Sequence, residues 1–166
     1  MQQRLFFYLL SPALIMLAAC QGYDFRINDK VMYTPDPLFS DFEAPDPALR
    51  ACLEQAISDG SITAVQKMSS LNCSHAGIEN LEGLGTFEGI SALRLSSNNI
   101  RNLVEISRLM ALEELYLDNN VIIDPVPLSR LAALRHLDLS GHSALQCPRS
   151  GSFEQLETLI LPQHCR

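Results

Sequence analysis

Basic residues are scarce in this sequence. Of its 166 residues only 12 are lysine or arginine, against 19 aspartates and glutamates, and the formal net charge is −7 at pH 7. A chain this acidic has no evident stripe of positive charge to contact phosphates, which argues against DNA or RNA as a partner. The length allows one domain with a real core plus a tail, and is too short for two domains of ordinary size.

Signatures of common ligand and catalytic sites are missing as well. The sequence has no phosphate-binding P-loop, no dinucleotide-binding fingerprint and no EF-hand loop. It also lacks the G-x-S-x-G turn that presents a nucleophilic serine in many hydrolases. We therefore expect a protein without enzymatic activity and without a cofactor.

A repeat is present instead. The tripeptides LRL, LYL and LDL begin at Leu93, Leu115 and Leu137, which are 22 residues apart. Self-similarity at such an interval predicts a solenoid, in which each unit is too small to bury its own apolar face and packs against its neighbours. The same phase extends back to Leu71 and forward to Leu159, so we expect five strands that start near these leucines.

The repeating unit, numbered from its first leucine, reads LxLxxNxIxxLxxIxxLxxL. It resembles the leucine-rich repeat of the 22-residue type found in internalin-like bacterial proteins, over roughly the second two-thirds of the chain. The resemblance implies an α/β leucine-rich repeat solenoid with a parallel β-sheet on its concave face. It also implies interaction with another molecule, without naming a partner.

The strands and the segments that return between them have different patterns. Side chains alternate along a strand, so the first and third positions of each unit should point into the core. At the sixth position an asparagine amide, as in Asn98 and Asn120, can bond backbone groups where the chain leaves the strand. Prolines in the return segments, at Pro125, Pro127 and Pro148, exclude regular α-helix and predict short 3₁₀ turns and extended chain on the convex side. The predicted core positions are Leu71 and Cys73, Leu93 and Leu95, Leu115 and Leu117, Leu137 and Leu139, and Leu159 and Leu161.

Residues 46–60 carry the clearest helix signal. Asp46 can accept hydrogen bonds from free helical amides as N-cap, Pro47 fits the first helical position, and Gly60 can end the helix. We expect this helix to cap the first unit of a repeat domain that spans residues 46–166, because an uncovered first unit would expose its apolar cross-section. Its apolar stripe at helical spacing consists of Leu49, Cys52, Leu53, Ala56 and Ile57.

The start of the chain has the features of a secretory signal: one arginine, an apolar run from Leu5 to Ala19, and small residues before Cys20. The run is shorter than the ~20 apolar residues that span a bilayer comfortably, although its length does not exclude an uncleaved anchor. The ending Leu-Ala-Ala-Cys resembles the lipobox of bacterial lipoproteins. The resemblance implies a signal peptide at residues 1–19 and lipid chains on Cys20; the alternative is an ordinary signal with an incidental cysteine.

The residue after Cys20 bears on location. It is Gln21, whereas an aspartate there would resemble the inner-membrane retention signal of enteric-type bacteria. We therefore expect a lipid anchor in the outer membrane with the domain facing the periplasm, and keep the cell surface as the alternative.

Residues 20–45 are expected to tether the domain to the lipid. Alternating apolar positions around Asn28-Asp29 also allow a short hairpin, but pairing Arg26 with Val31 gives no clean apolar face, so the tether is preferred. The stretch has too many aromatic residues for a freely solvated linker, so part of it should lie against the solenoid. The aromatic residues are Tyr23, Phe25, Tyr33, Phe39 and Phe42.

Four cysteines remain after Cys20, an even number for an oxidising compartment, and they allow three pairings. Cys52 lies on the apolar face of the predicted cap helix, and Cys73 points inward from the strand that this helix covers. Cys147 and Cys165 share the last two units. We predict one disulfide within each pair, one at each end of the solenoid.

A zinc site is the main alternative at the carboxyl end. His142 and His164 occupy the same position in adjacent units, about 5 Å apart, and with Cys147 and Cys165 they could supply two nitrogens and two sulfurs. The spacings do not match a paired zinc motif, and periplasmic cysteines tend to oxidise. Disulfides are therefore preferred over zinc and over free thiols, and no metal is expected.

Ser96 or Ser97, His75 and Asp118 have the residue types of a hydrolase triad and are expected on neighbouring strands. Nothing evident forms an oxyanion hole for it. Serines beside the strand-end asparagines are more simply turn residues that face solvent, so we assign no catalytic residue.

The concave face is the best candidate for binding. Positions two and four of each unit, and the residue before its first leucine, should project there. Tyrosine and arginine often anchor interfaces. His136 could gain charge near neutral pH beside Glu114, although simple pairing with that carboxylate is the plainer expectation. The alternative is a polar face that only keeps an open sheet solvated. The candidate partner-binding residues are Arg94, Glu114, Tyr116, Asp118, His136 and Asp138.

Together these features predict a monomeric, non-enzymatic, membrane-anchored lipoprotein of a Gram-negative envelope that binds a protein or a peptide through its concave face. One alternative is a structural component of an envelope assembly, in which the solenoid is a rigid spacer. Another is an internalin-like adhesin on the cell surface.

Overall fold

The structure, a computed structural model, describes residues 24–166, so the predicted signal peptide and the lipidation of Cys20 lie outside the described residues. The chain divides into two compact units, Met1–Pro37 and Leu38–Arg166, which are described separately below. Within the described residues, no helix combines the length and the apolar character that a membrane crossing requires.

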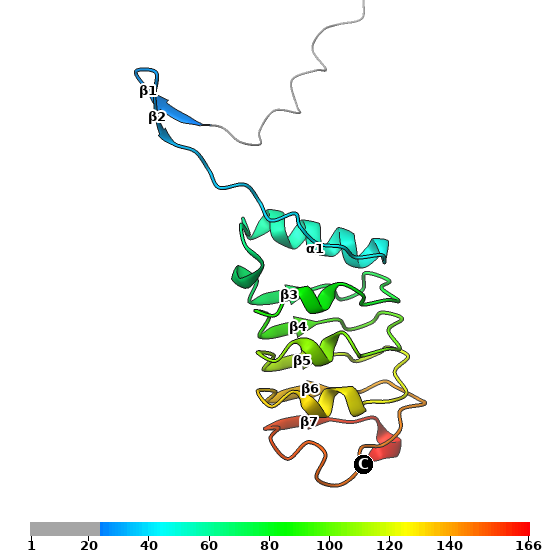
Figure 1. The fold of residues 1–166 in the computed structure, drawn as a ribbon. Coiled ribbons are helices and arrows are strands. Elements are labelled where there is room, and N and C mark those ends of the chain that lie inside the picture. Colours follow the sequence, from blue (N-terminus) through cyan, green and yellow to red (C-terminus); the bar gives the residue numbers. More distant parts are fainter. Residues whose placement is uncertain (1–23) are drawn as a thin grey trace, which may run out of the picture. The chain divides into compact units, whose positions relative to one another are not determined.

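The described part of the first unit is a β-hairpin. Strand β1 (Phe25–Ile27) pairs antiparallel with β2 (Lys30–Tyr33), and Arg26 lies opposite Val31. The two turn residues, Asn28 and Asp29, have positive φ angles of 50° and 61°, as the tightest hairpin turns require. Of the two alternatives for this stretch, the structure therefore forms the hairpin (blue in Figure 1).

The second unit is a solenoid built on one parallel sheet. Its strands follow each other in chain order, and they place Leu71, Leu93, Leu115, Leu137 and Leu159 side by side. This confirms the predicted solenoid with its parallel sheet. Each strand begins one residue before its first leucine. The strands are β3 (Ser70–Asn72), β4 (Ala92–Arg94), β5 (Glu114–Tyr116), β6 (His136–Asp138) and β7 (Thr158–Ile160).

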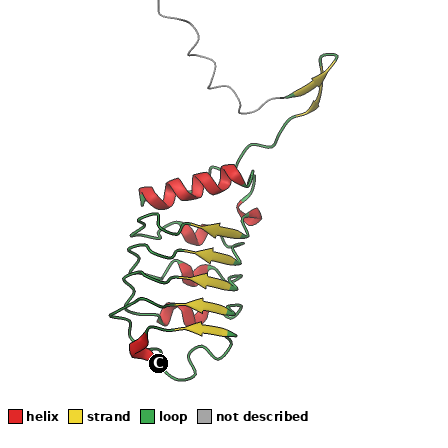
Figure 2. Ribbon diagram, turned by 180° about the vertical axis from the view of Figure 1, so that it is seen from behind, coloured by secondary structure: helices red, strands yellow, loops and turns green. Residues whose placement is uncertain are grey.

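Short 3₁₀ helices and extended chain form the return segments, as the prolines predicted. Figure 2 shows the helices that link β3 to β4, β4 to β5 and β5 to β6 behind the row of strands. Pro125 directly precedes the longest of them and serves as its N-cap, so the proline starts the turn instead of interrupting one. The 3₁₀ helices are η2 (Val65–Lys67), η3 (Leu84–Thr86), η4 (Ile106–Arg108), η5 (Val126–Arg130) and η6 (Gln163–Cys165).

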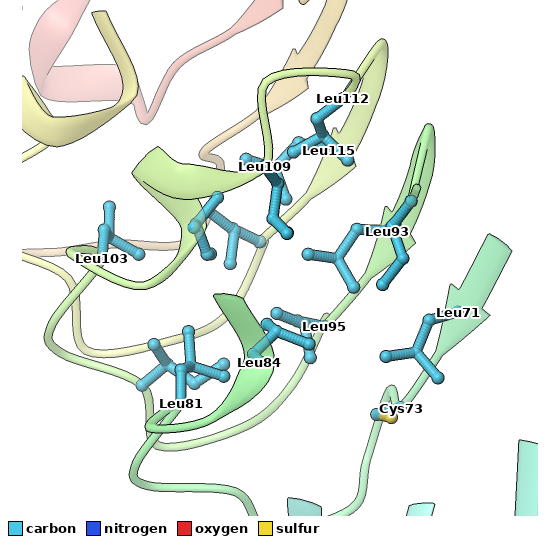
Figure 3. Packing of buried hydrophobic residues seen from close by; sticks show 14 of the residues in the cluster. Leu71, Cys73, Leu81, Leu84, Leu93, Leu95, Leu103, Leu109, Leu112 and Leu115 are labelled. Carbon is cyan, nitrogen blue, oxygen red and sulfur yellow. The ribbon is translucent and has the colours of Figure 1, made fainter. Parts of the chain in front are cut away.

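Leucines from the strands and from the return segments pack against one another in a continuous core (Figure 3). The predicted inward positions of β3, β4, β5 and β6 are all buried. The prediction is wrong for Leu159, which is 37% exposed. The reason is that β7 pairs with β6 alone, so no further described strand covers its other side.

The predicted cap helix is present as α1 (Pro47–Asp59), with Gly60 as its C-cap. It lies over the β3 end of the sheet in Figure 1. Leu49, Leu53 and Ile57 are buried beneath it, which confirms the predicted stripe. The remaining two stripe residues, Cys52 and Ala56, are partly buried against the same core.

Asp46 joins the cap helix to the first unit. One carboxylate oxygen accepts hydrogen bonds from the backbone N–H groups of Ala48 and Leu49, at 2.9 and 3.0 Å. The other accepts from Glu79 and Asn80, both at 2.9 Å. Burial tends to raise the pKa of this carboxyl, but the four backbone donors outweigh it and hold the pKa of Asp46 below its ordinary value.

Three phenylalanines extend the core beneath the segment that precedes α1. The ring of Phe87, which is buried, lies 6.0 Å from that of Phe39 and 5.6 Å from that of Phe42, centroid to centroid. Part of the aromatic stretch therefore packs on the solenoid, as predicted. Tyr33, in the hairpin unit, is exposed.

An asparagine closes the end of β4 and of β5. Asn98 is buried, accepts a hydrogen bond from the backbone N–H of Ile78 at 3.0 Å, and donates to the carbonyls of Cys73 and Leu95 at 3.0 and 2.9 Å. Asn120 repeats the same three bonds one unit later. This confirms the predicted role of the sixth position.

His142 occupies that position after β6 and keeps fewer of these bonds. Its Nδ1 donates to the carbonyl of Leu139 at 2.8 Å, because a carbonyl can only accept. Its Nε2 is buried and has no hydrogen-bond partner among residues 24–166. The ring therefore reproduces only the asparagine contact to the carbonyl three residues earlier.

The residue just before the sixth position is left-handed in four successive units. The φ angles are 59° at His75, 56° at Ser97, 55° at Asn119 and 79° at Gly141. Only the last of these is a glycine, the residue that adopts this conformation without strain. A backbone turn of the same kind thus ends each of these strands.

Candidate binding surface on the concave face

The sheet face turned away from the core, here called the concave face, carries all six predicted partner-binding residues on, or within two residues of, β4, β5 and β6. The strand register places Arg94 beside Tyr116, Tyr116 beside Asp138, and Glu114 beside His136. Side chains two residues apart share a face of a strand, so these residues form neighbouring rows across the sheet.

Arg94, Tyr116 and His136 form a stack across three strands. The guanidinium carbon of Arg94 lies 4.8 Å from the centre of the Tyr116 ring, within cation–π range. On the next strand the His136 ring lies 4.7 Å from the Tyr116 ring, centroid to centroid, at an interplanar angle of 35°. Arg94 is exposed and the two rings are partly buried. The tyrosine is thus held by a neighbour from each side.

The predicted pairing of His136 with Glu114 is wrong. In the described part of the chain the Nε2 atom of His136 is buried and has no hydrogen-bond partner. The ring packs on Tyr116 instead, and the carboxylate of Glu114 accepts a long hydrogen bond of 3.5 Å from the tyrosine hydroxyl. Ring stacking, rather than an ion pair, therefore orients this histidine.

Asp118 accepts hydrogen bonds from neighbouring side chains of the same protein. One carboxylate oxygen accepts a short hydrogen bond from the Ser96 hydroxyl, and the other accepts from the side-chain amide of Asn119 at 2.8 Å. A nucleophilic serine would instead donate to an imidazole, which would in turn be held by the aspartate. His75 is exposed, and the geometry of Ser96 and Asp118 is that of a structural contact. Of the predicted six, Asp118 is therefore the least available to a partner.

Asp138 differs from Asp118 because only one of its two carboxylate oxygens accepts a hydrogen bond from the described residues. Its Oδ1 accepts from the backbone N–H of Ser140 at 2.9 Å, a contact that fixes the side chain next to Tyr116. Together with Glu114, this leaves two carboxylates around the stacked rings and one guanidinium beside them. The face can therefore offer acceptors, one cationic donor and aromatic surface within a small area.

The cysteines pair as predicted. Cys52 of the cap helix is bonded to Cys73, and Cys147 is bonded to Cys165. The free-thiol alternative is therefore wrong for these four residues.

The four-ligand zinc alternative is also wrong in its geometry. Ligand atoms of Cys147, His164 and Cys165 lie within 4.8 Å of one another, but both sulfurs belong to the disulfide. His164 uses its Nε2 on the carbonyl of Leu145 at 3.0 Å. His142 is not part of this group, since its ring is buried and held by Leu139.

Comparison with known proteins identifies the repeat. Residues 44–163 match the family described as the leucine-rich repeat domain of the endo-β-N-acetylglucosaminidase EndoS. The chain belongs to this leucine-rich repeat family. No curated protein sequence matches the chain.

Solved leucine-rich repeat proteins share the fold. Internalin InlF of Listeria monocytogenes superposes with a TM-score of 0.64 at 22% identity, over 72% of this chain and 37% of that one. InlJ of the same organism, whose functional domain includes a cysteine ladder, gives a TM-score of 0.59 at 21% identity, over 69% and 26%. This chain thus spans well under half the length of these proteins. At such identities the likeness concerns the fold alone.

Two features of the site were not predicted from the sequence, and they differ in how much signal the sequence carries for them. The unpartnered Nε2 of His136 depends on side-chain geometry across two strands, which spacing does not specify. The bond between Ser96 and Asp118 had a usable signal, because the two residues lie one repeat apart at the same position.

Proposed function

We propose that this leucine-rich repeat protein binds a protein or peptide partner through its concave face, and that lipid chains on Cys20 hold it in the bacterial envelope. The proposal includes no enzymatic step. It rests on the fold, on membership in the leucine-rich repeat family, and on the lipobox-like sequence that ends at Cys20.

The stack of Arg94, Tyr116 and His136 is the observation that carries the binding proposal. Arginine and tyrosine are prominent among the residues that dominate interface energies. Here both are already ordered by contact with each other, so a partner would not have to immobilise them on binding. The carboxylates of Glu114 and Asp138 beside the rings would add polar specificity.

The size of the face bears on the kind of partner. Five strands about 4.8 Å apart give a surface only about 20 Å across. That width suits a peptide, or one edge of a protein, better than a surface that wraps a globular partner.

A photo-crosslinking residue placed at Ser74, on the same side of the sheet, would capture a partner in living cells. Charge reversal of Arg94 together with Tyr116→Ala should then abolish the crosslinked product, because both anchors of the stack are lost. Arg101→Glu with Val104→Ala is the matched control. Both of these residues are exposed and lie outside the concave rows, so this variant should crosslink like the wild type. An unchanged product in the Arg94 and Tyr116 variant would refute the proposal.

Location is tested separately. The proposal places the domain in the periplasm, on a lipid anchor in the outer membrane. Protease added to intact cells should then leave the protein whole and should digest it once the outer membrane is permeabilised. Digestion on intact cells would instead favour the surface adhesin.

The spacer function is a second candidate, and the exposed apolar hairpin favours it. If the hairpin segment docks into an assembly, deletion of residues 22–37, which keeps the signal sequence and Cys20, should abolish localisation while concave-face variants have no effect. The deletion must stop at Pro37. Phe39, Phe42 and Ala44 pack in the core of the solenoid unit, so a longer deletion would damage the fold itself.

A further inference from the structure

The β1–β2 hairpin exposes large apolar side chains that the described structure leaves uncovered. The exposed fractions are 50% at Ile27, 44% at Val31, 57% at Met32 and 62% at Tyr33, and every residue of β2 is exposed. An isolated two-stranded hairpin is marginally stable in water, and a cluster of exposed large apolar residues usually marks an interaction surface. The exposed apolar residues therefore indicate that the hairpin contacts another surface.

The apolar residues lie on both faces of the hairpin. Side chains alternate along β2, so Val31 and Tyr33 point to one face, and Lys30 and Met32 to the other. Ile27 is the cross-strand partner of Lys30 and shares its face. A protein surface would cover one face and leave the other in water. A lipid layer can surround both.

The polar groups of the hairpin fit the interfacial layer of a bilayer rather than its hydrocarbon centre. Within the described residues each strand of this two-stranded sheet has an open edge, and the hydrocarbon centre does not tolerate the unpaired backbone groups of such an edge. Tyr33 is of a type enriched at membrane interfaces, and Lys30 can extend its ammonium group to lipid phosphates. The polar turn at Asn28 and Asp29 can likewise remain among headgroups and water.

The position of the hairpin in the chain places it near a bilayer. Four peptide units separate Cys20 from Asp24, the first described residue. Fully extended, they span at most about 14 Å. Lipid chains on Cys20 would thus keep the hairpin within reach of the headgroups and raise its local concentration there. This step rests on the lipidation in the proposed function.

We propose that the β1–β2 hairpin is a second membrane contact, which immerses Ile27, Val31, Met32 and Tyr33 in the interfacial layer of the bilayer that holds the lipid on Cys20. The contact is with lipid, not with a protein partner. The first unit then binds lipid, whereas the concave face binds the protein or peptide partner.

The sequence contains no tryptophan, so a single substitution creates a unique fluorescent reporter. Tyr33→Trp and Met32→Trp place it on opposite faces of the hairpin. Met110→Trp is the matched control, because this residue is 56% exposed on the solenoid unit. Each variant is expressed as the full chain with its signal sequence, purified from the cell envelope and mixed with vesicles of phosphatidylethanolamine and phosphatidylglycerol, with or without brominated acyl chains. Co-sedimentation with the vesicles is measured first.

In vesicles without bromine both hairpin reporters should emit at shorter wavelength than the control, and brominated acyl chains should quench them, while the control reporter stays quenchable by aqueous iodide. Four results would overturn the proposal. These are hairpin reporters quenched by iodide alone, hairpin reporters shielded from both quenchers, quenching by lipid on one face only, and equal lipid quenching of the control. Chains that do not co-sediment at all would overturn the lipidation of Cys20 as well, which separates the two failures.

Discussion

The side chain at the sixth position determines how many backbone groups at the end of each strand have a hydrogen-bond partner. Asn98 and Asn120 each bond four backbone groups, whereas within the described residues His142 bonds one and leaves a buried ring nitrogen without a partner. A buried polar atom in that state costs about 1–3 kcal/mol. The end of β6 should therefore be less stable than the ends of β4 and β5.

His142→Asn is predicted to raise the free energy of unfolding by about 1 kcal/mol, because the amide can restore the missing backbone contacts. Urea denaturation with the disulfides intact measures the change. The reciprocal variant Asn120→His should lower the stability. If His142→Asn is less stable than the wild type, then packing of the imidazole ring matters more than the unpartnered nitrogen.

Gly141→Ala is predicted to destabilise the protein by more than the about 1–2 kcal/mol that a left-handed non-glycine residue costs. The added Cβ would clash with the side-chain oxygen of Asn119 and lie 3.0 Å from its backbone nitrogen. Gly77→Ala is a matched control, since its φ is also 79° but nothing lies within 4 Å of the added carbon. Equal losses in denaturation midpoint would show that the contact with Asn119 is unimportant.

Among the elements, α1 depends on a residue outside it. Asp46 caps the helix and also binds the backbone of the first unit, so one carboxylate positions the cap on the solenoid. The pKa of Asp46 is lowered in the folded protein. Its stabilising contribution is therefore complete above the unfolded pKa of about 3.9 and is lost as the pH falls through the folded value.

Asp46→Asn is predicted to lower the free energy of unfolding at pH 7 by about 1–2 kcal/mol and to flatten the loss of stability below about pH 4. Denaturation curves recorded from pH 7 down to the acid range measure both effects. Glu54→Gln, at an exposed position of the same helix, is the control and should leave the pH profile as in the wild type. A variant at Asp46 with an unchanged acid profile would contradict the assignment.

At the scale of the whole solenoid, the two disulfides hold the two ends. Each unit contacts only its neighbours, so opening should begin at an end and spread inward. Cys52–Cys73 ties the cap helix to the first unit, and Cys147–Cys165 closes the segment that includes β7.

Replacing either cysteine pair by alanine should reduce stability by about 2–4 kcal/mol. Hydrogen exchange should locate the effect. Without Cys52–Cys73, amides of α1 and β3 should exchange faster while β7 stays as in the wild type. Without Cys147–Cys165, amides of β7 should exchange faster while those of α1 and β3 stay as in the wild type. Faster exchange spread evenly over all strands in both variants would argue that the solenoid opens as a single unit.

The spacing of the leucines was sufficient to predict the strand register and the buried positions of β3 to β6. The reason is that every unit buries its apolar residues only when it stacks in phase with the next, so one interval specifies all the pairings. The cap helix was equally predictable, because Asp46, Pro47 and Gly60 are local signals. The disulfides followed once the register had placed Cys52 and Cys73 at the same end.

Only the tertiary structure decided how side chains use that register. Spacing places His136 beside Glu114, but the ring turns to Tyr116, since stacking geometry depends on rotamers across strands. The same spacing predicts that Leu159 is buried like the other leucines. It is 37% exposed, because no further described strand pairs with β7. Patterns that repeat along the chain specify how the strands pair. Contacts that occur at a single place depend instead on the packed three-dimensional surroundings.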